Sequence, residues 1–173
     1  RSTKGIQVMM LHIHSDETGS KLTDVQDVDV QPNAVDLRID KVFRLQDHKV
    51  FHISEDMKEH RGSLAVPPED DWWYLTPGVY EIVMQNTITV GEGEAGWVIT
   101  RSTLNRNGVF ITSGLYDSGY HGVMAGALHV TGGPMRIKRG TRVGQFLLFK
   151  SQTLKMYDGS YGIGKQHDEK YKG

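Results

Sequence analysis

The residues best suited to chemistry lie in a glycine-punctuated stretch, residues 114–122, which holds one carboxylate, Asp117, three positions before the aromatic ring of Tyr120. The three glycines of this stretch allow the backbone to turn sharply and to approach a ligand closely. The Asp117 carboxylate has the chemistry to orient or deprotonate a water molecule. Taken alone, the stretch fits a binding site and an ordinary turn between two strands equally well.

A second group of residues offers hydrogen-bond donors for phosphate oxygens. Arg101, Ser102 and Arg106 bring guanidinium and hydroxyl groups together at the end of a predicted strand. The planar guanidinium group can bind a phosphate through two parallel hydrogen bonds. The three residues therefore indicate an anion site.

The glycine-rich C-terminal segment, residues 159–166, carries Tyr161 and Lys165. Closed over a bound nucleotide, it would stack a ring on the base and bring an ammonium group near the phosphates. The alternative is a disordered tail that binds no ligand, because most glycine-rich chain ends are disordered.

Composition narrows the class of protein. The chain has 173 residues, 38% of them hydrophobic, a formal net charge of -1 and no cysteine. The absence of cysteine excludes disulfides, thiolate metal sites and cysteine nucleophiles. The net charge gives no overall electrostatic attraction to nucleic acid or to an anionic membrane. No apolar run approaches the length of a membrane span. We expect a soluble cytoplasmic protein with no nucleic-acid or membrane partner.

The sequence predicts that short strands position these residues. Val35, Leu37 and Ile39 alternate with Asp36 and Arg38, which predicts a strand with one buried face and one charged, half-exposed face. Similar short apolar runs separated by turn signals continue to about residue 150. This pattern predicts an all-β fold, a sandwich or a distorted jelly-roll barrel.

Residues 54–61 are the one segment that reads as a short helix, because Ser54 can cap it and Gly62 follows its end. The adjacent Trp72 and Trp73 cannot share one face of a strand, so we expect one of them to point outward.

The pattern of short apolar strands ends near Tyr157. We therefore predict a β domain over residues 1–156 and a flexible tail over residues 157–173 that closes over the site.

Six segments, taken in order, resemble the motifs of the trimeric dUTPase and dCTP deaminase superfamily. They are residues 31–38, 77–81, 96–108, 114–122, 140–145 and 157–162. The resemblance runs from about Asp29 to the C-terminus, and the ordered set is more specific than any one segment. It implies a distorted jelly-roll subunit and a homotrimer with active sites at the subunit interfaces. It also implies a pyrimidine deoxynucleoside triphosphate as substrate and Mg²⁺ bound mainly through the substrate phosphates.

The same resemblance implies roles for single residues. Asp117 would activate the water that attacks the α-phosphate, and Tyr120 would pack against the deoxyribose and exclude a 2′-hydroxyl. Asp36 would hold a metal ion indirectly, through a water molecule. The residues whose matched positions contact substrate are Arg101, Ser102, Arg106, Gly114, Tyr120, Gln145, Tyr161 and Lys165.

The two branches of the superfamily differ at position 127. Deaminases place there a glutamate that shuttles protons while water replaces the exocyclic amine, whereas this chain has Ala127, and its sequence has no acidic residue between His121 and Lys150. Thr103, Arg106 and the tail are nevertheless more deaminase-like. We expect hydrolysis of dUTP, or of a modified pyrimidine nucleotide, to the monophosphate and pyrophosphate. The alternatives are dCTP deamination and a catalytically silent nucleotide-binding homologue.

Overall fold

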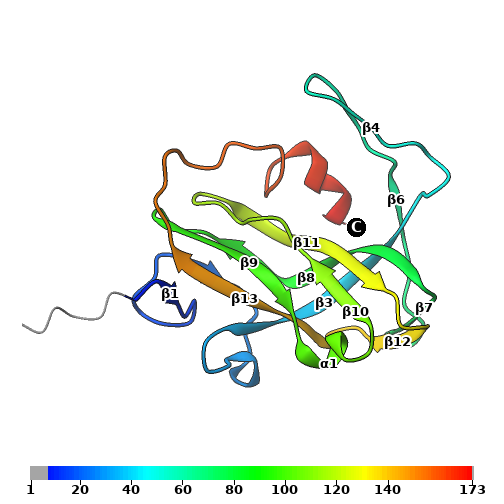
Figure 1. Cartoon of the computed structure of the whole chain (residues 1–173), viewed down its shortest axis with the longest axis horizontal. Helices are drawn as coiled ribbons and strands as arrows, with labels where there is room; N and C mark the ends of the chain where they lie inside the picture. The colour runs from blue at the N-terminus through cyan, green and yellow to red at the C-terminus, as the bar shows by residue number, and fades with distance from the viewer. Residues whose placement is uncertain (1–7, 173) are drawn as a thin grey trace, which may run out of the picture.

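The computed structural model describes residues 8–172, so the first seven residues of the predicted domain and the last residue of the predicted tail lie outside it. This part of the chain forms thirteen β-strands, one α-helix and two 3-10 helices (Figure 1). The strands are β1 (Met10–Leu11), β2 (Lys21–Leu22), β3 (Val35–Leu45), β4 (His52–Ile53), β5 (Lys58–Glu59), β6 (Ser63–Ala65), β7 (Trp72–Leu75), β8 (Gly78–Thr89), β9 (Glu94–Thr100), β10 (Val109–Thr112), β11 (His121–Val130), β12 (Met135–Lys138) and β13 (Arg142–Lys150). The helices are η1 (Asp27–Asp29), α1 (Ser102–Asn105) and η2 (Gln166–Lys172). The prediction of an all-β fold with at most one short α-helix is confirmed.

The main sheet curls into a half-barrel whose edges approach each other. Its strands run in the order β1-β13-β3-β8-β11-β10, and β9 pairs with β13. The amide of Ile111 in β10 donates to Thr100 Oγ1 in β9 at 2.8 Å, which connects the two edges. Apolar side chains fill the interior, among them Leu37, Ile82, Leu128, Phe146 and Leu148.

Strand β3 is covered on both faces, which differs from the prediction of a half-exposed strand. Val35, Leu37 and Ile39 are buried as expected, but Asp36 is also fully buried. Arg38 pairs with buried Asp29 of η1 at 2.7 Å. The charged face is covered because η1 and the side chains of β13 lie over it, an arrangement that the local sequence pattern does not encode.

The predicted helix over residues 54–61 is wrong. This segment forms the β4–β5 hairpin, closed by the Ser54 amide donating to the Met57 carbonyl at 2.8 Å. The segment has one large apolar residue, Met57, and therefore no apolar stripe that a helix could bury. The prediction for the tryptophan pair is confirmed, since Trp73 is 2% exposed and Trp72 is 37% exposed.

The C-terminal segment lies across the outer face of β8 and β11, where Figure 1 shows η2 in red above the sheet. The Ile163 amide donates to the His121 carbonyl at 3.0 Å. Tyr171 of η2 is buried, edge-on against Phe43 of β3 at 5.9 Å between ring centroids. Between residues 8 and 172, no helix is long and apolar enough to cross a membrane.

Candidate active site

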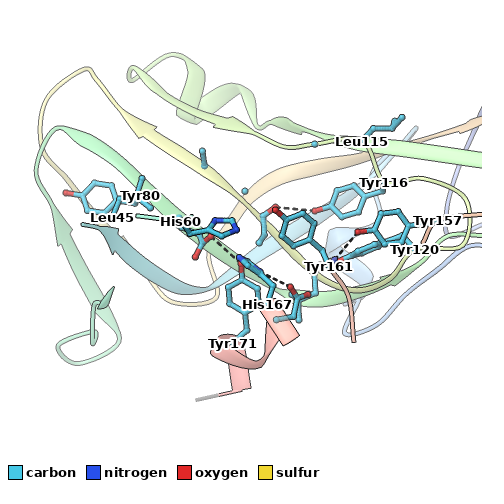
Figure 2. Close-up of a pocket in the computed structure, with 17 residues that line it drawn as sticks. Leu45, His60, Tyr80, Leu115, Tyr116, Tyr120, Tyr157, Tyr161, His167 and Tyr171 are labelled. Carbon is cyan, nitrogen blue, oxygen red and sulfur yellow. Dashed lines mark hydrogen bonds and ion pairs between the residues drawn. The ribbon is translucent and has the colours of Figure 1, made fainter. Parts of the chain in front are cut away.

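A pocket of about 510 Å³ lies between the outer face of β8 and β11, the 114–122 stretch and the C-terminal segment (Figure 2). Its size falls in the range of small-molecule sites. Aromatic rings form much of its wall. They belong to His60, Tyr80, Tyr116, Tyr120, Tyr157, Tyr161, His167 and Tyr171. Its floor is built partly from small residues, Ala125, Gly126 and Ala127.

Tyr120 stands in this wall with its ring packed edge-on against Tyr116 and Tyr157, at centroid distances of 5.4 and 5.3 Å. Its hydroxyl donates to the Val123 carbonyl at 2.6 Å. Burial, followed by the nearby carboxylate of Asp168, raises the pKa of Tyr120 above its ordinary value. The phenol therefore stays neutral, and its contacts hold the ring in place in the pocket wall.

Two other predicted contact residues also line the pocket, Gly114 and Tyr161. A side chain at Gly114 would meet nothing within 4 Å, so packing does not require a glycine there. In the same stretch, Gly119 has a φ of +90°, and a Cβ at Gly122 would lie 2.7 Å from the Cα of Gly162. Only these last two positions require glycine, for backbone conformation and for contact with the tail.

Asp117 lies outside the pocket and is exposed. It sits beside the first half of β9, because Tyr116 and Gly96 exchange backbone hydrogen bonds and the Ser118 hydroxyl donates to the Glu94 carbonyl. Its carboxylate is accessible to a second molecule.

Two of the predicted phosphate-binding residues, Arg101 and Gln145, lie instead around Asp36 of β3. Gln145 Nε2 donates to Asp36 Oδ1 at 3.1 Å, and Arg101 Nε lies 3.4 Å from Asp36 Oδ2. Arg142 Nη1 donates to the same Oδ2 at 3.2 Å, as does Gln31 Nε2 at 3.0 Å. We call Asp36, Arg101, Arg142 and Gln145 the Asp36 cluster.

The Asp36 cluster combines two guanidinium groups with one buried carboxylate and so has a surplus positive charge. The side chains of Arg101 and Arg142 are 29% and 31% exposed, whereas Asp36 is fully buried. One carboxylate thus orients two partly exposed cations. Such an arrangement binds anions with little loss of side-chain freedom.

Arg142 was not assigned a role from the sequence, although it lies in the matched segment 140–145. Residues three apart on a regular strand point to opposite faces, which separates Arg142 from Gln145. The pairing of β13 with β3 shifts register between Arg142 and Gly144. This bulge allows both side chains to reach Asp36.

The remaining predicted residues occupy the surface near these two regions. Ser102 begins α1 and is exposed, and Arg106 is exposed at the end of that helix. Lys165 lies 3.9 Å from the carboxylate of Asp158 and does not line the pocket. In one chain, the residues expected to form one site are therefore divided between the pocket and the Asp36 cluster, and Asp117 belongs to neither.

Glu81 of β8 is a pocket residue that sequence reasoning missed. It lies directly across the β8–β11 pair from Ala127. Its Oε1 is 2.8 Å from Lys170 Nζ, and Tyr171 Oη donates to its Oε2 at 3.3 Å. No local signal marks this residue, because strand register decides which side chain faces position 127.

The carboxylates and histidines of the described chain, residues 8–172, do not include three grouped closely enough to hold a metal ion. Asp36 already accepts from three donors on Oδ2 and one on Oδ1, counting the Arg101 ion pair. It offers no free face for direct coordination. The donor set fits a cation carried in by a ligand better than one held by the protein.

The sequence also matches known proteins. Residues 10–151 match the family model described as dCTP deaminase-like. A probable deoxyuridine 5′-triphosphate nucleotidohydrolase of Halobacterium salinarum is 35% identical over 143 residues, which cover 79% of this chain and 85% of that protein. A dUMP-forming dCTP deaminase of Parafrankia sp. is 34% identical over 132 residues, covering 72% of this chain and 65% of that protein.

The fold also has a counterpart among solved structures. The 2′-deoxycytidine 5′-triphosphate deaminase of Agrobacterium tumefaciens superposes with a TM-score of 0.60 at 17% identity. The match covers 79% of this chain and 44% of that one. The family match over residues 10–151 and the 35% identity to the Halobacterium protein establish that the chain belongs to the dCTP deaminase-like family.

Proposed function

We propose that the protein hydrolyses a pyrimidine deoxynucleoside triphosphate, dUTP above all, to the monophosphate and pyrophosphate. The observation that carries the proposal is the Asp36 cluster, whose partly exposed Arg101 and Arg142 are held ready for anions by one buried carboxylate. The family and the printed name of the Halobacterium relative support the choice of dUTP.

In the proposed reaction, water attacks the α-phosphorus, the bond to the bridging oxygen breaks, and pyrophosphate leaves. Asp117 accepts a hydrogen bond from the attacking water and takes its proton. Arg101, Ser102 and Gln145 hold the phosphates and offset the negative charge that develops on their oxygens. Arg106 extends this cationic surface from the end of α1.

The base and sugar would enter the pocket, where Tyr120 lines the wall and Gly114 leaves the backbone open. Tyr161 lines the same pocket. Tyr161 and Lys165 would close the site as the tail, residues 157–173, folds over the nucleotide. The cytoplasmic location expected from the sequence is part of the same proposal.

Such a site requires more than one chain. Asp117 lies beside the start of β9 and Arg101 directly follows its end. With a rise of 3.3 Å per residue, six residues separate them by about 20 Å. The spacing supports a site shared between subunits, and the resemblance to the trimeric superfamily implies three of them. We therefore propose a homotrimer in which Asp117 of one subunit meets the Asp36 cluster of another.

Mg²⁺ bound to the triphosphate would supply further charge neutralisation. The donors already engaged around Asp36 support an ion held mainly by the phosphates, with Asp36 acting only through a water molecule. Arg142 would also offset the negative charge of the phosphates, since it shares the Asp36 carboxylate and remains 31% exposed.

Deamination of dCTP is the second candidate, favoured by the name of the Parafrankia relative. Ala127 weighs against it, because a methyl group cannot move a proton. Loss of a general base costs on the order of a hundredfold to ten-thousandfold in rate.

The test is to incubate the purified protein and Mg²⁺ with dUTP, dCTP, dTTP and a 5-modified pyrimidine triphosphate, and to separate the products by chromatography. We expect dUMP and pyrophosphate from dUTP. Appearance of dUTP from dCTP would reject a purely hydrolytic enzyme. Four intact nucleotides, with dUTP still bound, would identify a silent nucleotide-binding protein.

A further inference from the structure

Glu81 brings a carboxylate to the part of the pocket floor where β11 has only a methyl group. Glu81 and Ala127 are directly opposed in the antiparallel β8–β11 pair. Opposed residues project from the same face of a sheet, with Cβ atoms about 5 Å apart. Both residues line the pocket. The small side chain at 127 therefore leaves Glu81 as the larger of the two side chains on this part of the pocket floor.

The contacts of Glu81 come from hydrogen-bond donors. Lys170 Nζ lies 2.8 Å from its Oε1, Tyr171 Oη donates to its Oε2 at 3.3 Å, and Ser63 Oγ donates to Oε1 at 3.4 Å. The Glu81 side chain is 21% exposed. An ionised carboxylate can only accept hydrogen bonds. This side of the pocket can thus accept hydrogen bonds from N–H or O–H groups of a ligand.

The two closest donors belong to η2 and not to the sheet. The side chains of Lys170 and Glu81 are 35% and 21% exposed, so solvent reaches the ion pair in part. Exposed ion pairs of this kind contribute little to stability. A ligand group with hydrogen-bond donors can therefore displace Lys170 at small cost.

We propose that Glu81 accepts a hydrogen bond from the exocyclic amino group of a cytosine-type base, and that Lys170 holds this acceptor while the pocket is empty. The inference rests on the proposed function, because it takes the pocket as the place where the nucleotide base binds. It widens the substrate class from dUTP to pyrimidine nucleotides that carry an amino group.

The chemistry of the two bases explains the selection. Cytosine presents two N–H donors at N4, and carboxylates accept from this group in known base recognition. Uracil presents a carbonyl oxygen at the same position, which would face the lone pairs of Glu81. Glu81 thus adds a hydrogen bond for the amino base that uracil does not receive, so that a cytosine-type nucleotide can bind as well as dUTP. A glutamine there could donate to uracil as readily as accept from cytosine.

The test measures binding of the α,β-imido analogues of dCTP and dUTP by isothermal titration calorimetry, with Mg²⁺ present. In Glu81→Gln, the ratio of the Kd for the dCTP analogue to the Kd for the dUTP analogue should rise about tenfold over wild type. Glu55→Gln, an exposed change on the β4–β5 hairpin, should leave the ratio within twofold. An equal ratio in wild type and Glu81→Gln would overturn the inference.

Lys170→Met gives a second measurement that does not alter Glu81. Removing the competing ammonium group should tighten the dCTP analogue more than the dUTP analogue, by about threefold or more. An unchanged or reversed ratio would contradict the inference. Melting temperatures of all variants confirm folding.

Hydrolysis by the wild-type preparation separates this inference from the proposed function. If wild type converts dUTP to dUMP and the ratio does not move in Glu81→Gln, only the role of Glu81 is rejected. If the ratio moves and no triphosphate is cleaved, hydrolysis is rejected and Glu81 stands as a base-recognition residue.

Discussion

Asp117 and Arg101 lie at opposite ends of strand β9 and face different regions of the surface. Asp117 is fixed beside β9 by the backbone hydrogen bonds between Tyr116 and Gly96, and Arg101 is drawn to Asp36. About 20 Å of strand separates a candidate water-binding carboxylate from the candidate phosphate site. In the proposed homotrimer, different subunits supply them to one substrate.

Changing Asp117→Asn should remove turnover while binding persists. The carboxamide keeps the shape of the exposed side chain but cannot take a proton from water, so we expect a loss in kcat of about a hundredfold to ten-thousandfold. Steady-state hydrolysis of dUTP and titration with its imido analogue measure the two effects. Asp56→Asn, on the exposed β4–β5 hairpin, is the matched control. Unchanged hydrolysis in Asp117→Asn would assign the water to another residue.

Gly122→Ala should release the C-terminal segment from the sheet. A Cβ at this position would lie 2.7 Å from Gly162 Cα and 2.8 Å from Tyr120 Oη. Overpacking of this kind costs about 1–3 kcal/mol, which raises the open population from about fivefold to about 150-fold. Limited trypsin digestion at Lys165 and Lys170 measures the opening.

The control for this change is Gly114→Ala, because an added Cβ there meets nothing within 4 Å. Its digestion should match that of wild type. Equal digestion of Gly122→Ala and wild type would show that the tail does not depend on this contact.

The Asp29–Arg38 pair should make stability depend on pH. Burial acts to raise the pKa of Asp29, but hydrogen bonds from Arg38 and from the Gln26 amide outweigh it and bring the pKa below its ordinary value of 3.8. The pair therefore stabilises the fold fully above about pH 4. This contribution is lost as pH falls through the lower pKa of the folded state.

Urea unfolding of wild type and Asp29→Asn checks this dependence. Breaking a buried pair typically costs about 3 kcal/mol, so we expect a gap of that size at pH 7 that narrows below pH 4. Asp27→Asn, an exposed change in the same 3-10 helix, should show no such gap. A gap that is constant from pH 7 to pH 3 would contradict the ionic origin.

The strands were predictable because apolar residues alternate in them. Val35, Leu37 and Ile39 show the period, and the glycine turns mark where strands end. The β4–β5 hairpin was not predictable in this way. Ser54 offered a helix cap, but a cap cannot hold a helix that has no apolar face to bury.

The candidate site was predictable in composition and not in arrangement. The sequence motifs contain Arg101, Gln145 and Asp36, which the fold brings together around one carboxylate. Sequence order cannot tell that Glu81 opposes Ala127, because strand register is set by the whole sheet. It also cannot tell that β9 holds Asp117 and Arg101 apart.

The most direct test of a site shared between subunits is to mix two inactive variants, Asp117→Asn and Arg101→Gln. The two proteins are unfolded together and refolded as random mixed trimers, and dUTP hydrolysis is measured with melting temperature as the control for folding. A site that takes Asp117 from one subunit and Arg101 from another recovers both native residues in about a quarter of cases. We therefore expect about a quarter of wild-type activity, and activity no greater than that of the separate variants would contradict a shared site.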